Sequence, residues 1–516
     1  MNSDTITVIH PEPLTEKCLR LEARGGAFAR AMMTIPTVVK PGEPFAATVS
    51  LLDENAMPIV AQDEVLVLGI EHAGEQAHLQ SKGASCSPLS PRARQVAPDG
   101  SSVLKVTFPA GRSAVCRVEG LSQPAAGYFR LQGEIGGQTF VSNPALATDE
   151  ERPLLLWGDP HIHTTVGDCH AERCRTRNVA YAAARHAYGL DFVAIADHVS
   201  WAPRGTAGKW YDNLAACELY DEPGVFSTLY CYETSMKGGR GGDCNIYLRQ
   251  PNRTYVDPWP DDLNIAGLCE QVEGDFFAVP HHTTRTGKHG EIPPEAYPDE
   301  KLMPVAEIHS KWGTSEYRGN PTPLAEIHPG PSYVQDLLAQ GYRFGFIGGT
   351  DSHTSLTFCL PLESEIHRSQ PGMTAVMVAA NNRNAIYDAI QARSCYAACG
   401  ERILLDVTCG GLAMGQAGPL PDAGDITIRA EYAAESEIES VEVIRNGEVV
   451  HRESPNAWKG ALEWTDRAVT EATPISDFTS GAPCVYYYVR ITAQSNARAW
   501  SSPCWFSLVN VDVSTG

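Results

Sequence analysis

The feature that most constrains the fold is a pattern that occurs three times: a short apolar run followed within a few residues by histidine or aspartate. The runs are 154–157, 192–196 and 344–347, and the polar residues after them are His161 and His163, Asp197 and His198, and Asp351 and His353. Short apolar runs bounded by glycine or polar residues are typical of buried strands. Histidine and aspartate at the carboxyl ends of parallel strands lie where α/β barrels place their catalytic groups.

The spacing within these motifs predicts metal binding. Residues i and i+2 of a strand face the same way, so His161 and His163 can contact one ion together, as can Asp351 and His353. Imidazole together with carboxylate suits zinc, manganese or iron better than calcium or magnesium.

Residues 154 to about 405 alternate between strand-like and helix-like patterns. Arg177 to Tyr188 has an alanine-rich helical pattern, and Gly189 is a suitable C-cap before the next apolar run. Residues 333–340 repeat this arrangement with Gly341, and Asn384 to Arg393 is a third predicted helix. Strands that alternate with helices predict a mostly parallel α/β architecture.

The two ends of the chain have a different pattern, with short strand-like fragments separated by turn residues. Phe45 to Leu52 is one such fragment, and Ser440 to Arg445 runs into Asn446-Gly447, a strong hairpin signal. Such fragments favour β-sandwiches, and a chain of 516 residues is too long for one ordinary core. We therefore predict an N-terminal β-sandwich-like domain (1–150), a central α/β domain that carries the metal-binding motifs (151–405) and a C-terminal β-sandwich-like domain (406–516).

Composition limits the partners and the compartment. The formal net charge of −22 argues against a nucleic-acid-binding surface. The first residues lack the pattern of a signal peptide, and no run of about 18 apolar residues predicts a membrane span. The 15 cysteines have no repeating spacing, so we expect mostly reduced thiols in a cytoplasmic protein. Nothing in the sequence decides between a monomer and a homo-oligomer.

Taken together, the order His-x-His, Asp-His, Glu, His, Asp-x-His resembles the PHP (polymerase and histidinol phosphatase) superfamily. The stretch Arg393 to Ile403 and the sequence Trp157-Gly158-Asp159 resemble one poorly characterised subgroup of it. The resemblance implies a distorted (β/α)₇ barrel with one to three metal ions at the strand ends. It also implies hydrolysis of phosphate esters, with sulfate esters as a second option.

Carried over residue by residue, the resemblance implies eight metal ligands: His161, His163, Asp168, His198, Glu233, His281, Asp351 and His353. The family's ninth ligand is a histidine on the strand near Asn245, where this chain has Asp243 and Cys244. That position therefore has either an altered ligand or none. Asp159 and Asp197 are better suited to orienting ligand histidines than to binding metal themselves.

The segment after His281 adds candidate catalytic groups. His282 adjoins a ligand and can protonate a leaving oxygen, and Arg285 and Lys288 suit a sulfate or phosphate group, although an ordinary solvated loop explains them equally well. His309 and Lys311 follow another strand-like run. They either line the entrance to the predicted metal site or belong to an ordinary strand end and turn. Four aromatic residues could contact an aryl leaving group or, equally well, pack under long loops: Trp201, Trp210, Tyr211 and Trp312.

These observations predict a hydrolase that uses two or three divalent ions, manganese or zinc with iron as a third option, on a small anionic ester. No Gly-x-Ser-x-Gly nucleophile elbow and no phosphate-binding loop of the Walker type occurs in the sequence. The alternative is a non-catalytic, metal-containing binding or regulatory module. An open coordination position for water would distinguish the enzyme from that module.

Overall fold

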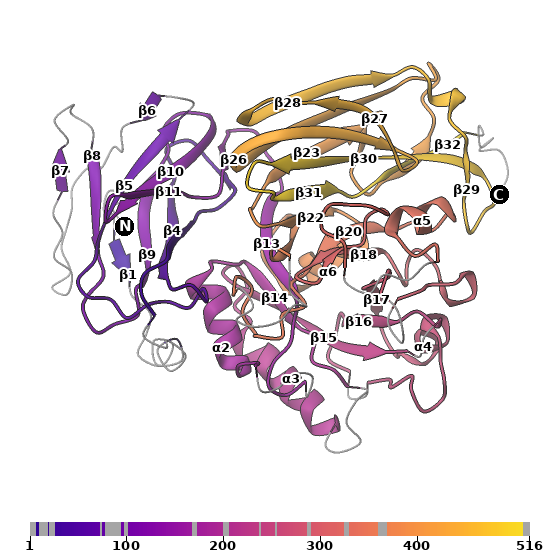
Figure 1. Ribbon diagram of the computed structural model, residues 1–516, viewed down its shortest axis with the longest axis horizontal. Coiled ribbons are helices and arrows are strands. Elements are labelled where there is room, and N and C mark those ends of the chain that lie inside the picture. Colours follow the sequence, from indigo (N-terminus) through magenta and orange to yellow (C-terminus); the bar gives the residue numbers. More distant parts are fainter. Residues whose placement is uncertain are drawn as a thin grey trace.

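The computed structural model describes residues 7–9, 19, 26–72, 75–77, 94–96, 102–167, 173–199, 206–236, 239–252, 255–285, 290–324, 330–359 and 369–508. In this part of the chain strands predominate and helices are few and short (Figure 1). None of its helices is long and apolar enough to cross a membrane. Its cysteines are free, buried thiols.

Two sheets near the N-terminus enclose one core. The first sheet has the order β1 (Thr7–Ile9), β9 (Val115–Ser122), β4 (Pro44–Leu52) and β2 (Arg30–Thr34). The second has the order β3 (Val38–Val39), β12 (Ala145–Ala147), β10 (Gly127–Ile135), β5 (Val65–His72), β8 (Ser102–Thr107) and β7 (Arg94–Val96), with β6 (Glu75–Ala77) and β11 (Gln138–Val141) at its side. Alternate residues of β4, including Phe45 and Val49, are buried against residues of the second sheet such as Phe129.

The central segment begins with three parallel strands, β13 (Leu154–Ile162), β14 (Phe192–Ile195) and β15 (Ser227–Ser235). Next come β16 (Asp243–Leu248), β17 (Phe276–His281), β21 (Gly372–Val378) and β22 (Cys395–Cys399), with β19 (Gly313–Thr314), β18 (Val305–Ser310) and β20 (Gly345–Gly348) in a separate sheet. The helices are α2 (Arg177–Ala182), the π-helix η1 (Ala183–Ala187), α3 (Thr206–Tyr220), α4 (Ile265–Gln271), η2 (Pro294–Ala296), α5 (Val334–Ala339) and α6 (Arg383–Gln391).

The predicted (β/α)₇ barrel and mostly parallel α/β architecture are wrong. The described strands form open, mixed sheets, and none of these closes into a barrel. After β15 the chain turns back through Gly239, Gly241 and Gly242, all at positive φ, so β16 pairs antiparallel to β15 instead of following a helical crossover. β17 and β21 also pair antiparallel to their neighbours. Apolar runs reveal buried strands, but they do not reveal strand direction.

Several individual elements were nevertheless predicted correctly. The helix predicted from Arg177 is α2 continued by η1, and Gly189 follows it at φ +57°. The helices predicted near 333–340 and 384–393 are α5 and α6.

The C-terminal strands continue the central sheet. β31 (Arg498–Ser501) pairs antiparallel with β22, and the long β26 (Ile426–Arg445) pairs with several other strands. The remaining elements are β23 (Leu404–Cys409), β24 (Leu412–Ala413), β25 (Ala417–Pro419), β27 (Glu448–Glu453), β28 (Ala457–Asp466), η3 (Val469–Glu471), β29 (Ile475–Ser476), β30 (Pro483–Ala493) and β32 (Cys504–Ser507). The predicted Asn446-Gly447 hairpin is confirmed, since both residues have positive φ between β26 and β27.

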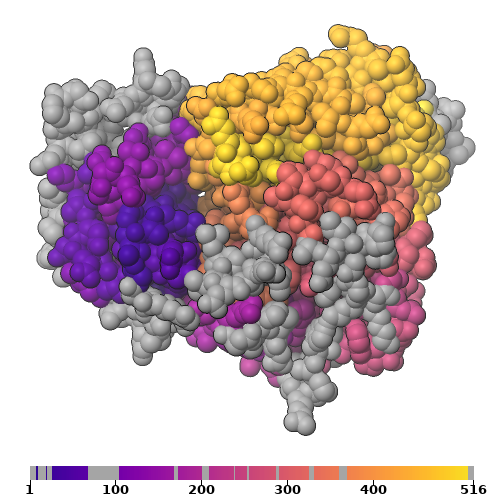
Figure 2. Space-filling view, in the orientation of Figure 1, coloured from indigo at the N-terminus to yellow at the C-terminus, as the bar shows by residue number. Residues whose placement is uncertain are grey.

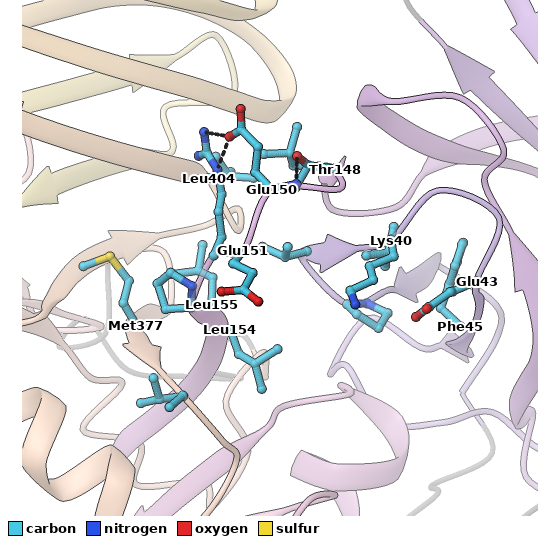
Figure 3. Close-up of a pocket in the computed structure, with 18 of the residues that line it drawn as sticks. Lys40, Glu43, Phe45, Thr148, Glu150, Glu151, Leu154, Leu155, Met377 and Leu404 are labelled. Atoms are coloured by element: carbon cyan, nitrogen blue, oxygen red, sulfur yellow. Dashed lines mark hydrogen bonds and ion pairs between the residues drawn. The ribbon is translucent and has the colours of Figure 1, made fainter.

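Figure 2 shows the N-terminal sheets (indigo to purple) to the left of the C-terminal strands (orange to yellow), with much of the central segment (pink to salmon) below the C-terminal strands. A cavity of about 1370 Å³ lies where β3, β4, the start of β13 and β23 come together (Figure 3). Its walls are apolar at Phe45 and Leu154, while Arg152 pairs with Glu150 and Asp406 at 3.3 and 3.2 Å. None of the predicted site residues lines this cavity.

Candidate metal centre

The structure brings seven of the eight predicted ligands into one buried cluster of the central segment. His161 lies at the end of β13 and His163 just beyond it, Glu233 lies in β15, and His281 ends β17. His198 follows β14, and Asp351 and His353 follow β20. The eighth, Asp168, lies outside the described residues.

Four of these residues form the centre of the cluster. His163 Nε2 lies 3.1 Å from Glu233 Oε2 and 3.0 Å from Asp351 Oδ1. His161 Nε2 lies 3.3 Å from the same Glu233 oxygen and 3.6 Å from the same Asp351 oxygen. All four ligand atoms lie within 4.8 Å of one another. Two imidazole nitrogens and two carboxylate oxygens therefore converge on one point.

The second oxygens of the two carboxylates face further histidines. Glu233 Oε1 lies 3.3 Å from His281 Nε2 and 3.5 Å from His198 Nδ1. Asp351 Oδ2 lies 2.5 Å from His282 Nε2. Three more groups of potential ligands thus adjoin the central one: Glu233, Asp243 and His281; His281, His282 and Asp351; and His163, His198 and His353.

Of the two residues at the position that the sequence left undecided, Asp243 rather than Cys244 faces the cluster. In the ladder between β16 and β17, Asp243 is paired with His281. Because neighbouring residues of a strand face opposite sides, Cys244 points away and packs in an apolar core with Leu268 and Cys269. Burial raises the pKa of the Cys244 thiol well above its ordinary value.

The ionisable groups of the centre strongly affect one another. Burial alone would lower the pKa of His161, but the carboxylates of Glu307 and Asp351 outweigh it and raise the pKa to about 10. Burial likewise opposes ionisation of Glu233, yet the surrounding histidines hold its pKa well below the ordinary value. The pKa of Asp351 is depressed in the same way, against burial, by His161 and His282.

The pKa values of the other histidines do not all shift in the same direction. The pKa of His163 is raised well above its ordinary value by Glu233 and Asp351, against the effect of burial. Burial lowers the pKa of His198 to about 4 and also lowers that of His282, which favours their neutral, metal-binding form.

This charge pattern fits a metal ion. The carboxylates hold His161 and His163 in the protonated form, and a divalent cation bound by the same atoms would displace those protons. The buried histidine, glutamate and aspartate groups can therefore hold a metal ion, and their nitrogen and oxygen donors match the class predicted from the sequence.

Three carboxylates outside the cluster orient its parts. Glu307 of β18 accepts a hydrogen bond from His161 Nδ1 at 2.9 Å. Asp159 accepts hydrogen bonds from the Thr350 backbone and hydroxyl at 3.0 and 2.6 Å, and Asp197 accepts two from Thr164 at 2.6 and 2.7 Å. The role predicted for Asp159 and Asp197 was to orient ligand histidines, but both bond to threonines and neither bonds to a ligand imidazole in the described contacts. Sequence reasoning did not identify Glu307, whose only signal was its place at the end of an apolar run.

The backbone of the turns that carry the ligands lies very close to neighbouring side chains. A Cβ at Gly349 would lie 2.4 Å from Glu307 Oε2 and 2.6 Å from His161 Cβ, so only glycine fits there. Asp351 and His282 have φ values of +49° and +52°, a left-handed conformation that side chains other than glycine rarely adopt. Strained residues of this kind often occur at functional sites.

Trp312 connects the cluster to Arg285. Its ring lies edge-on to His282 and His353, with centroids 5.2 and 5.7 Å apart, and the Arg285 guanidinium lies 4.5 Å above it. Arg285 thus stacks on a ring that contacts two histidines of the cluster. Lys288 and Trp201 lie outside the described residues.

The remaining candidates do not belong to the groups of potential ligands. His309 contacts Thr314 and the Gln370 carbonyl, and the ammonium of Lys311 is bonded to a neighbouring loop. Trp210 is buried against Tyr232, whereas Tyr211 is half exposed on α3.

Comparisons with known proteins do not identify a function for this chain. Residues 361–417 match the family described as "Protein of unknown function (DUF3604)". An uncharacterized protein of Chlamydia pneumoniae is 32% identical over 247 residues, which are 46% of this chain and 39% of that protein. An uncharacterized protein of Chlamydia trachomatis is 30% identical over 215 residues, 40% of this chain and 34% of that protein. The chain therefore spans little more than a third of the length of these relatives.

Among solved structures, the human F-spondin reeler domain aligns with 24% of this chain and 96% of its own, at 13% identity and a TM-score of 0.17. Escherichia coli alpha-2-macroglobulin aligns with 96% of this chain and 23% of its own, at 8% identity and a TM-score of 0.16. Scores this low do not establish a common fold. What the chain shares with known proteins is thus a match over 57 residues to a family of unknown function and a partial similarity to uncharacterized chlamydial proteins.

Proposed function

We propose that this chain is a metal-dependent hydrolase of small anionic esters, either sulfate esters or phosphate mono- and diesters. The observation that carries the proposal is the sharing of Glu233 and Asp351, each of which faces histidines through both of its oxygens. Shared carboxylates let neighbouring ions lie a few ångströms apart, as in two-metal hydrolytic sites. The order of these residues in the sequence also resembles the PHP superfamily.

The proposal assigns two or three divalent ions to the cluster, manganese or zinc with iron as a third option. When bound, such ions polarise the ester and lower the pKa of water at the site. The central group and the group of Glu233, Asp243 and His281 supply ligands for two of them. A third would use His163, His198 and His353.

The chain's own residues bind the substrate and move a proton. Arg285 is permanently charged and presents a planar fork that pairs with the oxygens of a sulfate or phosphate group. His282 is neutral at rest because burial lowers its pKa. It takes up the proton that the attacking water releases, and it gives a proton to the ester oxygen as the bond from that oxygen to sulfur or phosphorus breaks. Water supplies the oxygen that replaces it, so the products are an alcohol or phenol and the inorganic anion, or a monoester when the substrate is a diester.

One observation favours the non-catalytic alternative. The described members of the cluster are nearly inaccessible, with exposed fractions of 8% for His198, 5% for His353 and 4% for His282. A fully closed site holds a structural ion, whereas a catalytic site keeps one coordination position open.

The test is hydrolysis of p-nitrophenyl sulfate, p-nitrophenyl phosphate and bis-p-nitrophenyl phosphate after loading with Mn²⁺ or Zn²⁺, with His161→Ala as the control. Metal-dependent turnover that the variant loses would support the proposed hydrolase activity. The relative rates on the three substrates would then show which class of ester is preferred. Tight metal binding without turnover of any of the three would favour the binding module.

A further inference from the structure

The loop that carries two of the candidate ligands is folded back on itself. It runs from Asp351 to Cys359 and includes His353. The backbone N–H of Asp351 donates to the His161 carbonyl at 2.8 Å, and the Ser355 hydroxyl donates to the His163 carbonyl at 2.7 Å. The loop therefore sets Asp351 against the two histidines of β13.

A buried lysine closes this loop. Lys311 Nζ donates to the carbonyls of Leu356 and Cys359 at 2.7 and 2.8 Å, and to the Ser352 hydroxyl at 3.2 Å. These bonds use all three of its N–H groups and join the start of the loop to its end. Ser352 lies between Asp351 and His353 in the chain, so Lys311 acts on the residue that separates the two ligands.

Lys311 has no carboxylate partner within ion-pair distance among the described residues, and only 2% of it is exposed. Burying an ammonium group without a paired counter-ion is costly. Here three neutral oxygens and the more distant charges of Asp159 and Asp351 offset only part of that cost, so burial still lowers the pKa of Lys311. Such a residue is poorly explained as a general contribution to stability. Its three bonds all serve the geometry of one loop.

A second cation reaches the same loop from the N-terminal sheet. Arg30 of β2 donates through Nη2 to the Phe358 carbonyl at 2.9 Å. The Phe358 ring packs edge-on against Tyr188 at 5.2 Å, and Tyr188 itself donates to the Ala56 carbonyl. The end of the loop is thus fastened to a part of the chain that is remote in sequence from the metal ligands.

We propose that Lys311 and Arg30 are positioning residues of the metal centre, which hold the 351–359 loop so that Asp351 and His353 meet the β13 histidines. This inference rests on the proposed function, because it assumes that the cluster binds metal. It makes the N-terminal sheet a contributor to the site although that sheet supplies no ligand.

The test measures binding of Mn²⁺ and Zn²⁺ by calorimetry to the full chain and to Lys311→Ala, with the exposed Lys301→Ala as the matched control. Residues that orient metal ligands typically contribute about 10- to 100-fold in affinity, and a loss of that size is expected for Lys311→Ala but not for Lys301→Ala. Methylammonium should restore affinity to Lys311→Ala, since it can donate to the same three oxygens. A purely structural lysine would not give metal affinity that depends on the added amine.

Arg30→Gln provides a second variant in case Lys311→Ala does not fold, and a similar loss of metal affinity is expected. Wild-type affinity in folded Lys311→Ala, or in Arg30→Gln if the lysine variant is unfolded, would overturn this inference alone. Failure of the wild-type protein to bind either ion would overturn the proposed function as well. The two failures are therefore distinguishable.

Discussion

Glu307 accepts a hydrogen bond from Nδ1 of His161 at 2.9 Å, on the side of the ring opposite the cluster. This bond fixes the tautomer of His161 and directs Nε2 toward Glu233 and Asp351. Carboxylate–histidine pairs of this kind support metal ligands in many proteins. The pair also connects the separate sheet of β18 to the end of β13.

Glu307→Gln is expected to weaken metal binding about 10- to 100-fold while the ligands themselves stay in place. The amide is neutral, so it no longer raises the basicity of the ring. Calorimetric titration with Zn²⁺ would measure the change, and Glu295→Gln, an exposed substitution on η2, is the control. Equal affinities for the Glu307 variant and the wild type would show that the bond does not support the site.

Asp351→Asn is expected to abolish metal binding with little change in secondary structure. The substitution keeps the size of the side chain but removes a charge shared by two groups of ligands. Metal content by mass spectrometry and circular dichroism would measure the two effects. A fully loaded variant would contradict the central role of Asp351.

Asp243→Asn should lower the number of ions bound, whereas Cys244→Ala should not. Asp243 faces Glu233 and His281, while Cys244 packs in the apolar core on the other side of β16. Metal-to-protein ratios would distinguish the two, and Co²⁺-loaded protein should lack a sulfur-to-metal absorption band. Such a band, lost in Cys244→Ala, would reverse the assignment.

The metal-free protein is expected to lose stability as the pH rises from 6.5 toward 10. The pKa of His161 is raised from 6.5 to about 10 in the folded state, so its stabilising effect is complete below pH 6.5 and disappears over that interval. Metal-loaded protein should show the opposite trend, because binding requires neutral imidazole and strengthens as protons are lost. Urea unfolding with and without a chelator would measure both trends, and parallel curves would exclude the coupling.

The sequence identified most of the candidate site because its signals are local. His161, His163, Asp351 and His353 follow apolar runs directly, and the structure places them together. The positions of Glu307 and Lys311 depend on how β18 pairs with β20, which a local pattern does not record. Strand direction was missed for the same reason, since it also depends on which strands pair.

The pairing of β31 with β22 has a consequence for biosynthesis. The partner of Cys399 in that ladder is Arg498, about a hundred residues later in the chain. Until residues 498–501 have left the ribosome, this edge of β22 has no partner and can pair with other nascent chains. The central sheet and the metal ligands it carries therefore reach their final form only after β31 has been synthesised.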